Sequence, residues 1–401
     1  MKKLNLFLIF IFTMLVYTSC KNYVTNVDPL VTAVDDSELN NEAQIPFVIK
    51  GVETRFAYAL AQTDVCAAGL SDAFFFDPNV PSATYPSFDE IDRGKIQLTN
   101  NSVDGAYNPV GQFRFYADDL IRRVNSIPIS DDAVKNNALF TGYFYGGYAR
   151  YLYAAYFGLN PTEGGSPIDN SPFINSNEMY DLAIEKFKES IKYLSDDLMI
   201  RTVNSVIARA YLYKGDFPNA ASYASNGLVV GDAPFQALHN SNQDNYWWEQ
   251  AGALRPQFVA DLRFKGYIDS DPNEVNRIKI DSVIGFNDEI YYFQVVYPED
   301  VSSQNIITWQ ENNLIRAELI LRGAGSGDAI ALVNEVRTSH AIAPLNSVDL
   351  DVIYSERDKE LFASGNRLVD ERRFNKWHLS AGTWEYLPVT ERERNGNPNI
   401  N

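Results

Sequence analysis

The sequence contains very little histidine and cysteine. Its 401 residues include three histidines and two cysteines. His239, His340 and His378 lie far apart along the chain, and none belongs to an H-E-x-x-H segment or has a cysteine nearby. Zinc sites use histidine and cysteine at short, regular spacings. The sequence therefore predicts no zinc site.

Other motifs of catalysis and cofactor binding are also missing. There is no G-x-S-x-G segment, and the glycine-rich run at 323–327 lacks the G-K-[ST] ending of a phosphate-binding loop. Residues 269–273 resemble the start of a calcium loop, but Glu274 replaces the required glycine and Ile280 the final acid. We therefore expect no catalytic residue, no cofactor and no metal ion, and interpret 269–273 as an acidic turn.

Positive charge is scarce. Lysine and arginine number 34 against 52 aspartates and glutamates, which gives a formal net charge of -18. Binding to phosphate backbones needs clustered Lys and Arg side chains. This composition argues against nucleic acid as a ligand. The many carboxylates allow dozens of acid pairs of the kind that hydrolyse glycosides, so such pairs carry no information.

The sequence has one long apolar run, at residues 4–16, which follows Lys2 and Lys3. About 20 apolar residues are needed to span a bilayer. The run ends at Thr18-Ser19-Cys20, and small polar residues before a cysteine are typical of a lipoprotein cleavage site. We predict a signal peptide at 1–19, acylation of Cys20 and anchoring to a membrane. Cys66 is then the only remaining thiol, which excludes an intrachain disulfide.

A helical hairpin at 205–230 is the clearest structural pattern in the chain. Relative to Gly215, Ala208 lies seven residues before, Tyr211 four before, and Ala220 and Ala224 five and nine after. This is the tetratricopeptide spacing, in which small residues on one helix make room for large ones on the other. Gly215 is predicted to form the turn.

One hairpin cannot bury its apolar face alone, so further helix pairs are expected beside it. The segments 140–157 and 178–194 form one predicted pair, and 312–323 with 328–339 another. The predicted fold is a mainly α, tetratricopeptide-like helical repeat scaffold with an inserted irregular subdomain. We divide the chain into a tether at 20–44 and one domain at 45–401, with repeats near 45–66, 112–230 and 312–340 and the insert at 233–310.

Two irregular segments carry aromatic residues that no helical periodicity explains. One is the proline-rich loop at 71–110, and the other is the insert around 246–248. Binding residues often lie on loops held by a rigid scaffold, and aromatic rings stack well on flat ligands. We predict a ligand site where the two segments meet, with Tyr85, Tyr107, Trp247 and Trp248 as candidate stacking residues.

The C-terminal segment 349–401 resembles a known family. It contains Glu356-Arg357, Glu360-Leu361, Gly365, Arg367, Asp370 and Arg372-Arg373-Phe374. This is similar to the E-R-x-x-E-L-x-x-E-G-x-R-x-x-D-x-x-R-W motif of the SusD/RagB outer-membrane lipoproteins, with Ser364 and Phe374 as departures. Residues 387–390 and 397–399 resemble that family's L-P-I-P…N-P-N ending, and 312–318 and 334–337 its L-I-x-A-E-A and L-N-x-V-R segments.

The resemblance implies a function without catalysis. Members of this family are lipid-anchored at the outer membrane, capture a nutrient and pass it to a partner TonB-dependent, SusC-like transporter. The expected ligand is a glycan or oligosaccharide, with a peptide as the second choice, and display on the cell surface is expected. Arg367 and Asp370, three residues apart, are expected to pair on an exposed helix face. The alternatives are an envelope assembly or scaffold lipoprotein that binds another protein, and a glycoside hydrolase.

Overall fold

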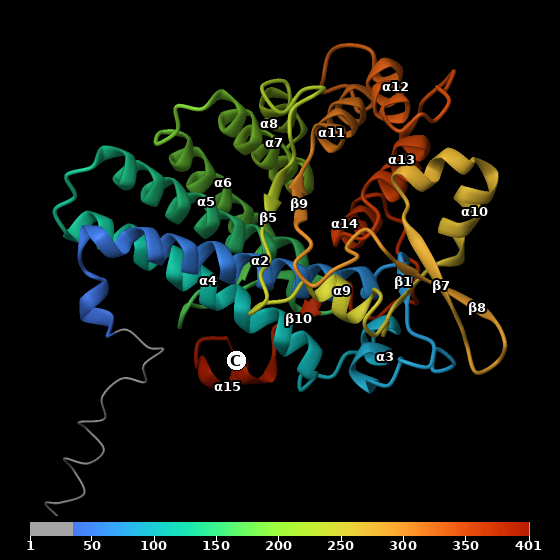
Figure 1. Cartoon of the computed structure of the whole chain (residues 1–401), viewed down its shortest axis with the longest axis horizontal. Helices are drawn as coiled ribbons and strands as arrows, with labels where there is room; N and C mark the ends of the chain where they lie inside the picture. Colours follow the sequence, from blue (N-terminus) through green and yellow to red (C-terminus); the bar gives the residue numbers. More distant parts are fainter. Residues whose placement is uncertain (1–34, 401) are drawn as a thin grey trace, which may run out of the picture.

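The computed structural model describes residues 35–400, and within them the chain is mainly helical, as predicted (Figure 1). Two short 3-10 turns, Asp36–Leu39 and Glu42–Gln44, precede the first long helix. Residues 1–19 and Cys20 lie outside the described residues. No helix within 35–400 combines the length and the apolar character needed to cross a bilayer.

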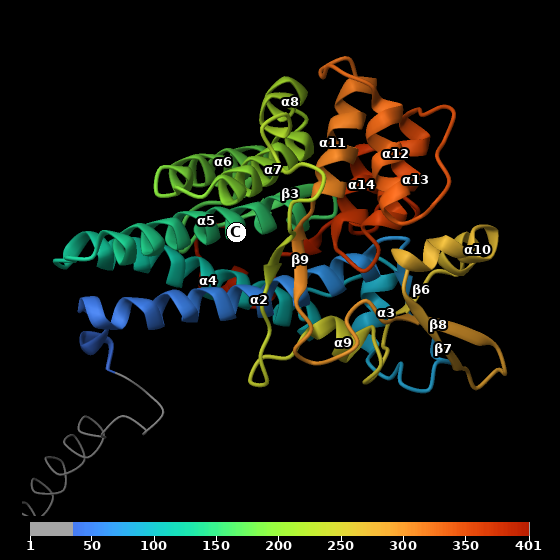
Figure 2. The same ribbon diagram turned by 45° about the horizontal axis from the view of Figure 1, so that its top comes forward.

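The helices pack as a series of neighbours. Helices α4, α5, α6, α7 and α8 contact one another in chain order, α2 packs on α4 and α5, and α8 contacts α11 (Figures 1 and 2). Their bounds are α2 Ile45–Leu70, α4 Asn101–Ser126, α5 Asp132–Tyr156, α6 Ser176–Ile191, α7 Asp197–Lys214, α8 Phe217–Ala224, α11 Trp309–Leu321 and α12 Ala329–Ser339.

The hairpin of α7 and α8 forms as the tetratricopeptide spacing predicts. Gly215 ends α7 with a φ of 86°, a left-handed conformation that glycine adopts at little cost. The side chain of Asp216 then caps α8 by accepting from the amide of Asn219. Ala208 and Ala220 are fully buried, so neither small residue is left on the surface.

The glycine-rich run after α11 is a turn, as predicted. Gly323 and Gly327 have φ values of 76° and 122°, and the turn leads into α12, which packs on α11. Asp328 caps α12 through the amides of Ile330 and Ala331. Asp271 likewise acts in helix capping, because its side chain accepts from the amide of Asn273 at the start of the short helix η3 (Pro272–Asn276).

Helix α4 begins earlier than the sequence predicted. Residues 71–110 were expected to be loop and the helix to resume at 112, yet α4 starts at Asn101 and contains Pro109. The side chain of Asn100 accepts from the amides of Ser102 and Val103, which caps the helix strongly. The carbonyl that the proline ring crowds belongs to Gly105, four residues earlier, where no side chain adds to the crowding.

The insert forms a small sheet that also includes one strand from the loop after α2. The strand order is β1-β6-β8-β7, all antiparallel, and β1 comes from the loop after α2. The strands are β1 Phe74–Phe75, β6 Val259–Ala260, β7 Ile280–Ile284 and β8 Ile290–Gln294, accompanied by α3 Pro86–Asp92, α9 Tyr246–Gln250 and α10 Leu262–Ser270. Strands β5 (Phe235–Ala237) and β9 (Gln304–Ile307) pair where the chain leaves and re-enters the repeats.

The C-terminal part lies against both the repeats and the insert. Helix α13 (Leu350–Glu360) packs on α11, and α14 (Asn366–Arg373) packs on α2 and α5. A second sheet has the order β10-β2-β3-β4, with β10 parallel to β2. Its strands are β2 Phe157–Asn160, β3 Glu163–Ser166, β4 Ile174–Asn175 and β10 Leu387–Pro388, and the last helix is α15 Glu391–Gly396.

The prediction that Arg367 and Asp370 pair on an exposed face is wrong. Both residues are buried, and each has another partner. Arg367 binds Asp72 at the end of α2 with Nε 2.6 Å from Oδ1, and Asp370 accepts from Nε of Arg357 at 2.8 Å and of Arg373 at 2.7 Å. The error arose because these partners belong to other turns and other elements, which helical spacing alone cannot show.

The charged side chains of this network lie in the interior of the protein. Arg373 also binds the fully buried Glu318 of α11, with Nη2 2.7 Å from Oε2. Burial alone would raise the pKa of Asp370, but the charges of Arg357 and Arg373 outweigh it and hold that pKa below its ordinary value. Asp370 is therefore ionised in the folded protein. The network joins α11, α13 and α14.

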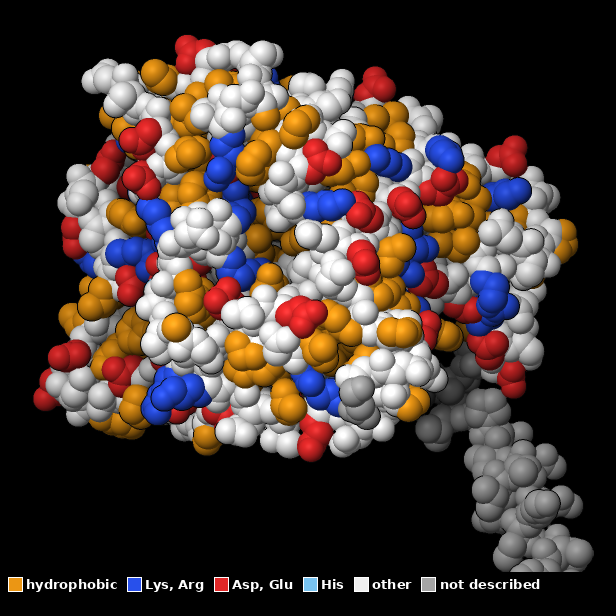
Figure 3. Space-filling model, turned by 180° about the vertical axis from the view of Figure 1, so that it is seen from behind, with side chains coloured by type: hydrophobic (Ala, Val, Ile, Leu, Met, Phe, Trp, Pro, Cys, Tyr) orange, Lys and Arg blue, Asp and Glu red, His pale blue; other side chains and the backbone are white. Residues whose placement is uncertain are grey.

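Surface charge is mixed. On the face drawn in Figure 3, Lys and Arg side chains lie among Asp and Glu side chains, with apolar side chains between them. This face therefore shows no broad surface of one sign.

We predict that Arg357→Met destabilises the protein strongly. The variant leaves the buried Asp370 with Arg373 as its remaining ionic partner and removes the donor to the Tyr213 hydroxyl. Loss of one member of a buried ion pair typically costs about 3 to 5 kcal/mol. Urea unfolding measures this free energy.

The matched control is Lys376→Met, because the Lys376–Asp351 pair is exposed. It should cost less than about 1 kcal/mol. Equal stability of the two variants would show that the buried network does not stabilise the fold as described.

Candidate functional site

The loop at 71–100 and the insert meet, as predicted, and one buried glutamine joins them. Gln257 Oε1 accepts from the amides of Thr84 and Tyr85 at 2.9 and 3.0 Å. Its Nε2 donates to the carbonyl of Ser82 at 2.6 Å, and the hydroxyl of Ser82 donates to the carbonyl of Pro256. These hydrogen bonds fix the backbone from Ser82 to Tyr85.

Tyr85 is the exposed aromatic residue at this junction. It is the residue before α3, whose first residue is Pro86, so its backbone is extended and its side chain stays outside the helix. Its ring packs on Phe88 on one side, and the guanidinium carbon of Arg255 lies 4.6 Å from its centroid. With 36% of its surface exposed, the ring still reaches solvent.

Arg255 connects Tyr85 to α9. Its Nη2 lies 3.4 Å from Oε1 of Glu249, the residue after the half-buried Trp248. The Nε atom of Arg255 is buried without a hydrogen-bond partner. A planar ring, a guanidinium and a carboxylate therefore lie together, which suits a ligand with hydroxyl groups and an apolar face.

A depression of about 330 Å³ adjoins Tyr85. It is lined by Tyr85, Pro86, Ser87, Glu90, Thr99, Asn100 and Asn101. The loop, α3 and the first residue of α4 form its walls, so backbone capping and the bonds of Gln257 determine its shape.

Two of the four predicted stacking residues are part of the core. Trp247 has no exposed surface and packs against Phe74 and Tyr297, with ring centroids 5.4 and 6.1 Å away. Tyr107 is buried in α4, and its hydroxyl hydrogen-bonds Ser166 Oγ at 2.8 Å. The stacking role predicted for both rings is corrected, since neither offers a face to solvent. Tyr85 and Trp248 remain candidates.

Sequence reasoning missed Arg255, Glu249 and Gln257. The aromatic pattern drew attention to α9, but nothing in the sequence pairs Arg255 with a tyrosine 170 positions earlier. The neighbouring Pro256 was the one available indication of an irregular segment here, and this segment contacts the loop at Ser82.

Buried acids lie behind the loop. Burial raises the pKa of Glu371 to about 7, although the imidazole of His378, 3.0 Å away, opposes the shift. Burial likewise raises the pKa of Asp92, the last residue of α3, to about 6, opposed by the amide of Phe76 and by His378. Neither residue lines the depression beside Tyr85.

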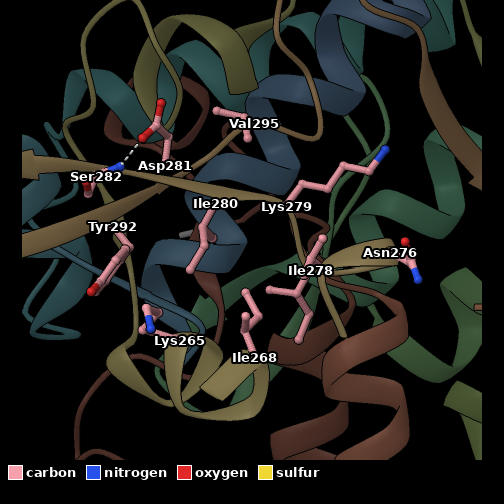
Figure 4. A pocket seen from close by; sticks show the side chains of 11 residues that line it. Lys265, Ile268, Asn276, Ile278, Lys279, Ile280, Asp281, Ser282, Tyr292 and Val295 are labelled. Atoms are coloured by element: carbon pink, nitrogen blue, oxygen red, sulfur yellow. Dashed lines mark hydrogen bonds between the residues drawn. The ribbon is translucent and has the colours of Figure 1, made fainter. Parts of the chain in front are cut away.

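A larger pocket of about 650 Å³ lies in the insert (Figure 4). Side chains from α10, η3, β7 and β8 and the residues beside them surround it, and five of the eleven are Ile or Val. Its lining includes Ile268, Val275, Ile278, Ile280, Tyr292 and Val295, with Lys265 and Lys279 at its margin. Aliphatic walls with few planar polar groups suit apolar side chains better than sugar hydroxyls.

Within residues 35–400, no group of three or more histidine, cysteine or acidic side chains is placed to hold a metal ion. His340 and His378 each lie beside one glutamate. His239 is buried, and burial lowers its pKa to about 4.

The fold matches solved structures over nearly its whole length. A SusD superfamily protein from Bacteroides thetaiotaomicron is 16% identical, with a TM-score of 0.73 over 90% of this chain and 99% of that one. The chain has a SusD-like fold. A laminarin-binding SusD-like protein is also 16% identical, with a TM-score of 0.71 over 90% of this chain and 98% of that one.

A third structural neighbour is surface glycan-binding protein A from Bacteroides thetaiotaomicron. It is 13% identical, with a TM-score of 0.64 over 88% of this chain and 96% of that one. At these identities the likeness concerns the fold. No protein-family profile matches the sequence, and no curated protein matches it.

Proposed function

We propose that this protein belongs to the SusD/RagB family and binds a glycan or oligosaccharide without transforming it. The observation that carries the proposal is the exposed ring of Tyr85 with Arg255 across its face, at a junction held rigid by Gln257. The names of two neighbours with the same fold, a laminarin-binding and a surface glycan-binding protein, support this ligand class.

The wider role follows from the same proposal. The protein is anchored at the outer membrane through Cys20, faces the cell exterior and delivers its ligand to a TonB-dependent, SusC-like transporter. The signal peptide and Cys20 at 1–20 support anchoring to a membrane. The C-terminal motif that resembles the SusD/RagB family supports a SusC-like transporter as the partner.

A peptide is the second candidate ligand. The aliphatic pocket of the insert favours it, because side chains such as Ile268 and Ile278 pack well against apolar peptide side chains.

A scaffold that holds another envelope protein is the alternative function. In that case the protein copurifies with a partner and binds none of the saccharides tested.

We expect Tyr85→Ala to weaken glycan binding by about three- to tenfold, because an aromatic contact contributes about 0.5 to 1.5 kcal/mol beyond its buried area. Affinity electrophoresis in laminarin, starch or xylan identifies the polysaccharide that binds, and calorimetry then gives Kd. Trp248→Ala should have a similar effect.

The matched control is Phe286→Ala, which removes an aromatic ring that is 74% exposed between β7 and β8. Its affinity should equal that of the wild type. Full affinity of both Tyr85→Ala and Trp248→Ala would remove this surface from consideration.

We expect Cys20→Ser to release the protein from membranes. Two or more acyl chains hold a protein firmly at a bilayer, and the variant lacks the sulfur atom that carries the lipid. Cell fractionation with immunoblotting measures the membrane-bound share, with Cys66→Ser as the control that keeps the signal intact. Membrane association that persists in the Cys20 variant would show that the signal is not of the lipoprotein type.

A further inference from the structure

A groove between α2 and α4 lies apart from the Tyr85 depression. Two adjoining hollows, of about 560 and 380 Å³, share Gln112 and Tyr116 of α4 as lining residues. The first hollow is completed by α2 and by Gln243 of the insert, and the second by α15 and the segment after β3. The two helices are packed side by side, as Figure 1 shows.

Three aromatic rings are exposed at this groove. Phe47 of α2 is 70% exposed, and Phe115 and Tyr116 of α4 are 56% and 43% exposed. The buried face of α4 already contains Phe113 and Ala117. Phe115 and Tyr116 therefore contribute little to the core, although leaving such rings in water forgoes the free energy of burying them. Each ring is therefore accessible from solvent.

Two side chains that line the first hollow each have one polar atom without a partner. These atoms are Nε of Arg55 and Oε1 of Gln243, which are buried and make no hydrogen bond within the protein. The Arg55 guanidinium is held over the ring of Tyr58, 4.8 Å from its centroid. Leaving a buried polar group without a hydrogen bond is unfavourable. One donor and one acceptor match a hydroxyl group, which both donates and accepts.

Charged side chains of both signs line the groove, and Arg114 is already paired. Nη1 of Arg114 lies 3.2 Å from Oδ2 of Asp169 and 3.3 Å from Oδ2 of Asp118. Lys50, Arg55 and Arg392 line the groove together with Asp169 and Glu393, and this mixture of signs favours a neutral ligand over a charged one. The centres of protein interfaces are poor in charged residues, so this lining also fits a protein partner less well than a saccharide.

We propose that this groove is a second saccharide-binding surface, for a neutral oligosaccharide that stacks on Tyr116 and Phe47 and hydrogen-bonds Arg55 and Gln243. The proposal rests on the glycan-binding function proposed above and adds to it the length of the ligand. Asn101, at the Tyr85 depression, and Asn108 and Gln112, at the groove, follow one another on one face of α4. Asn101 and Gln112 lie about 17 Å apart along the axis at 1.5 Å per residue. A long chain contacts both surfaces, and a short one contacts only the first.

Calorimetry with oligosaccharides of two to seven sugars, prepared from laminarin, starch and xylan, tests this proposal. Tyr116→Ala should weaken binding of the longest chain about three- to tenfold and leave the shortest one that binds unchanged. Tyr85→Ala should weaken both. Arg55→Lys, which keeps the charge but removes the planar Nε donor, should weaken long chains alone. Phe286→Ala is the control, and circular dichroism establishes that each variant is folded.

Unchanged affinity of Tyr116→Ala and Arg55→Lys for every chain length would overturn the second surface, while a loss in Tyr85→Ala would leave the proposed function standing. Absence of binding to all three saccharide series in the wild type would overturn both. Loss of a copurifying protein from Tyr116→Ala, with saccharide affinity intact, would make the groove a protein-docking surface instead.

Discussion

Buried ion pairs made by the C-terminal segment determine how the parts of this protein are placed. Asp370 accepts hydrogen bonds from Arg357 and Arg373, and Arg373 also donates one to Glu318 of α11, in the last repeat pair. A buried charge without its partner is strongly destabilising. Each pair therefore requires the elements that carry its two residues to lie in register. The C-terminal helices are therefore fixed on the repeats by electrostatics as well as by apolar packing.

A second set of pairs extends this constraint to the insert. Arg263 of α10 binds Asp72 and Asp358 with donor distances of 2.8 Å, and Arg367 of α14 binds Asp72 as well. Asp72 lies between the end of α2 and β1, where the loop toward Tyr85 begins. The β1 and β6 pairing and the bonds of Gln257 then extend this placement to Tyr85 and the proposed ligand site. A ring held in this way loses little conformational entropy on binding.

Local patterns predicted most of the helical scaffold. The spacing around Gly215 identified the α7 and α8 hairpin, and the glycines at 323–327 identified the next turn, because both depend on residues a few positions apart. Pro109 misled the prediction of α4, since the cap at Asn100 and the glycine at 105 are enough to keep the helix intact.

The candidate site was predictable as a region and less so as residues. Aromatic residues outside helical periodicity located the junction of loop and insert, and Tyr85 is exposed there. Trp247 and Trp248 are neighbours that point differently, and sequence alone does not show which of them is buried. Tyr107 was misplaced together with the start of α4. Periodicity does not reveal which face of a helix lacks a neighbour, so the exposed ring of Tyr116 on α4 was not predicted.

The crystal structure of the protein bound to its best oligosaccharide tests this account most directly. The account predicts a sugar ring against the exposed part of the Tyr85 side chain, within hydrogen-bonding distance of Arg255, with no change in the backbone held by Gln257. A saccharide bound in the aliphatic pocket of the insert, with Tyr85 and Arg255 untouched, would contradict it.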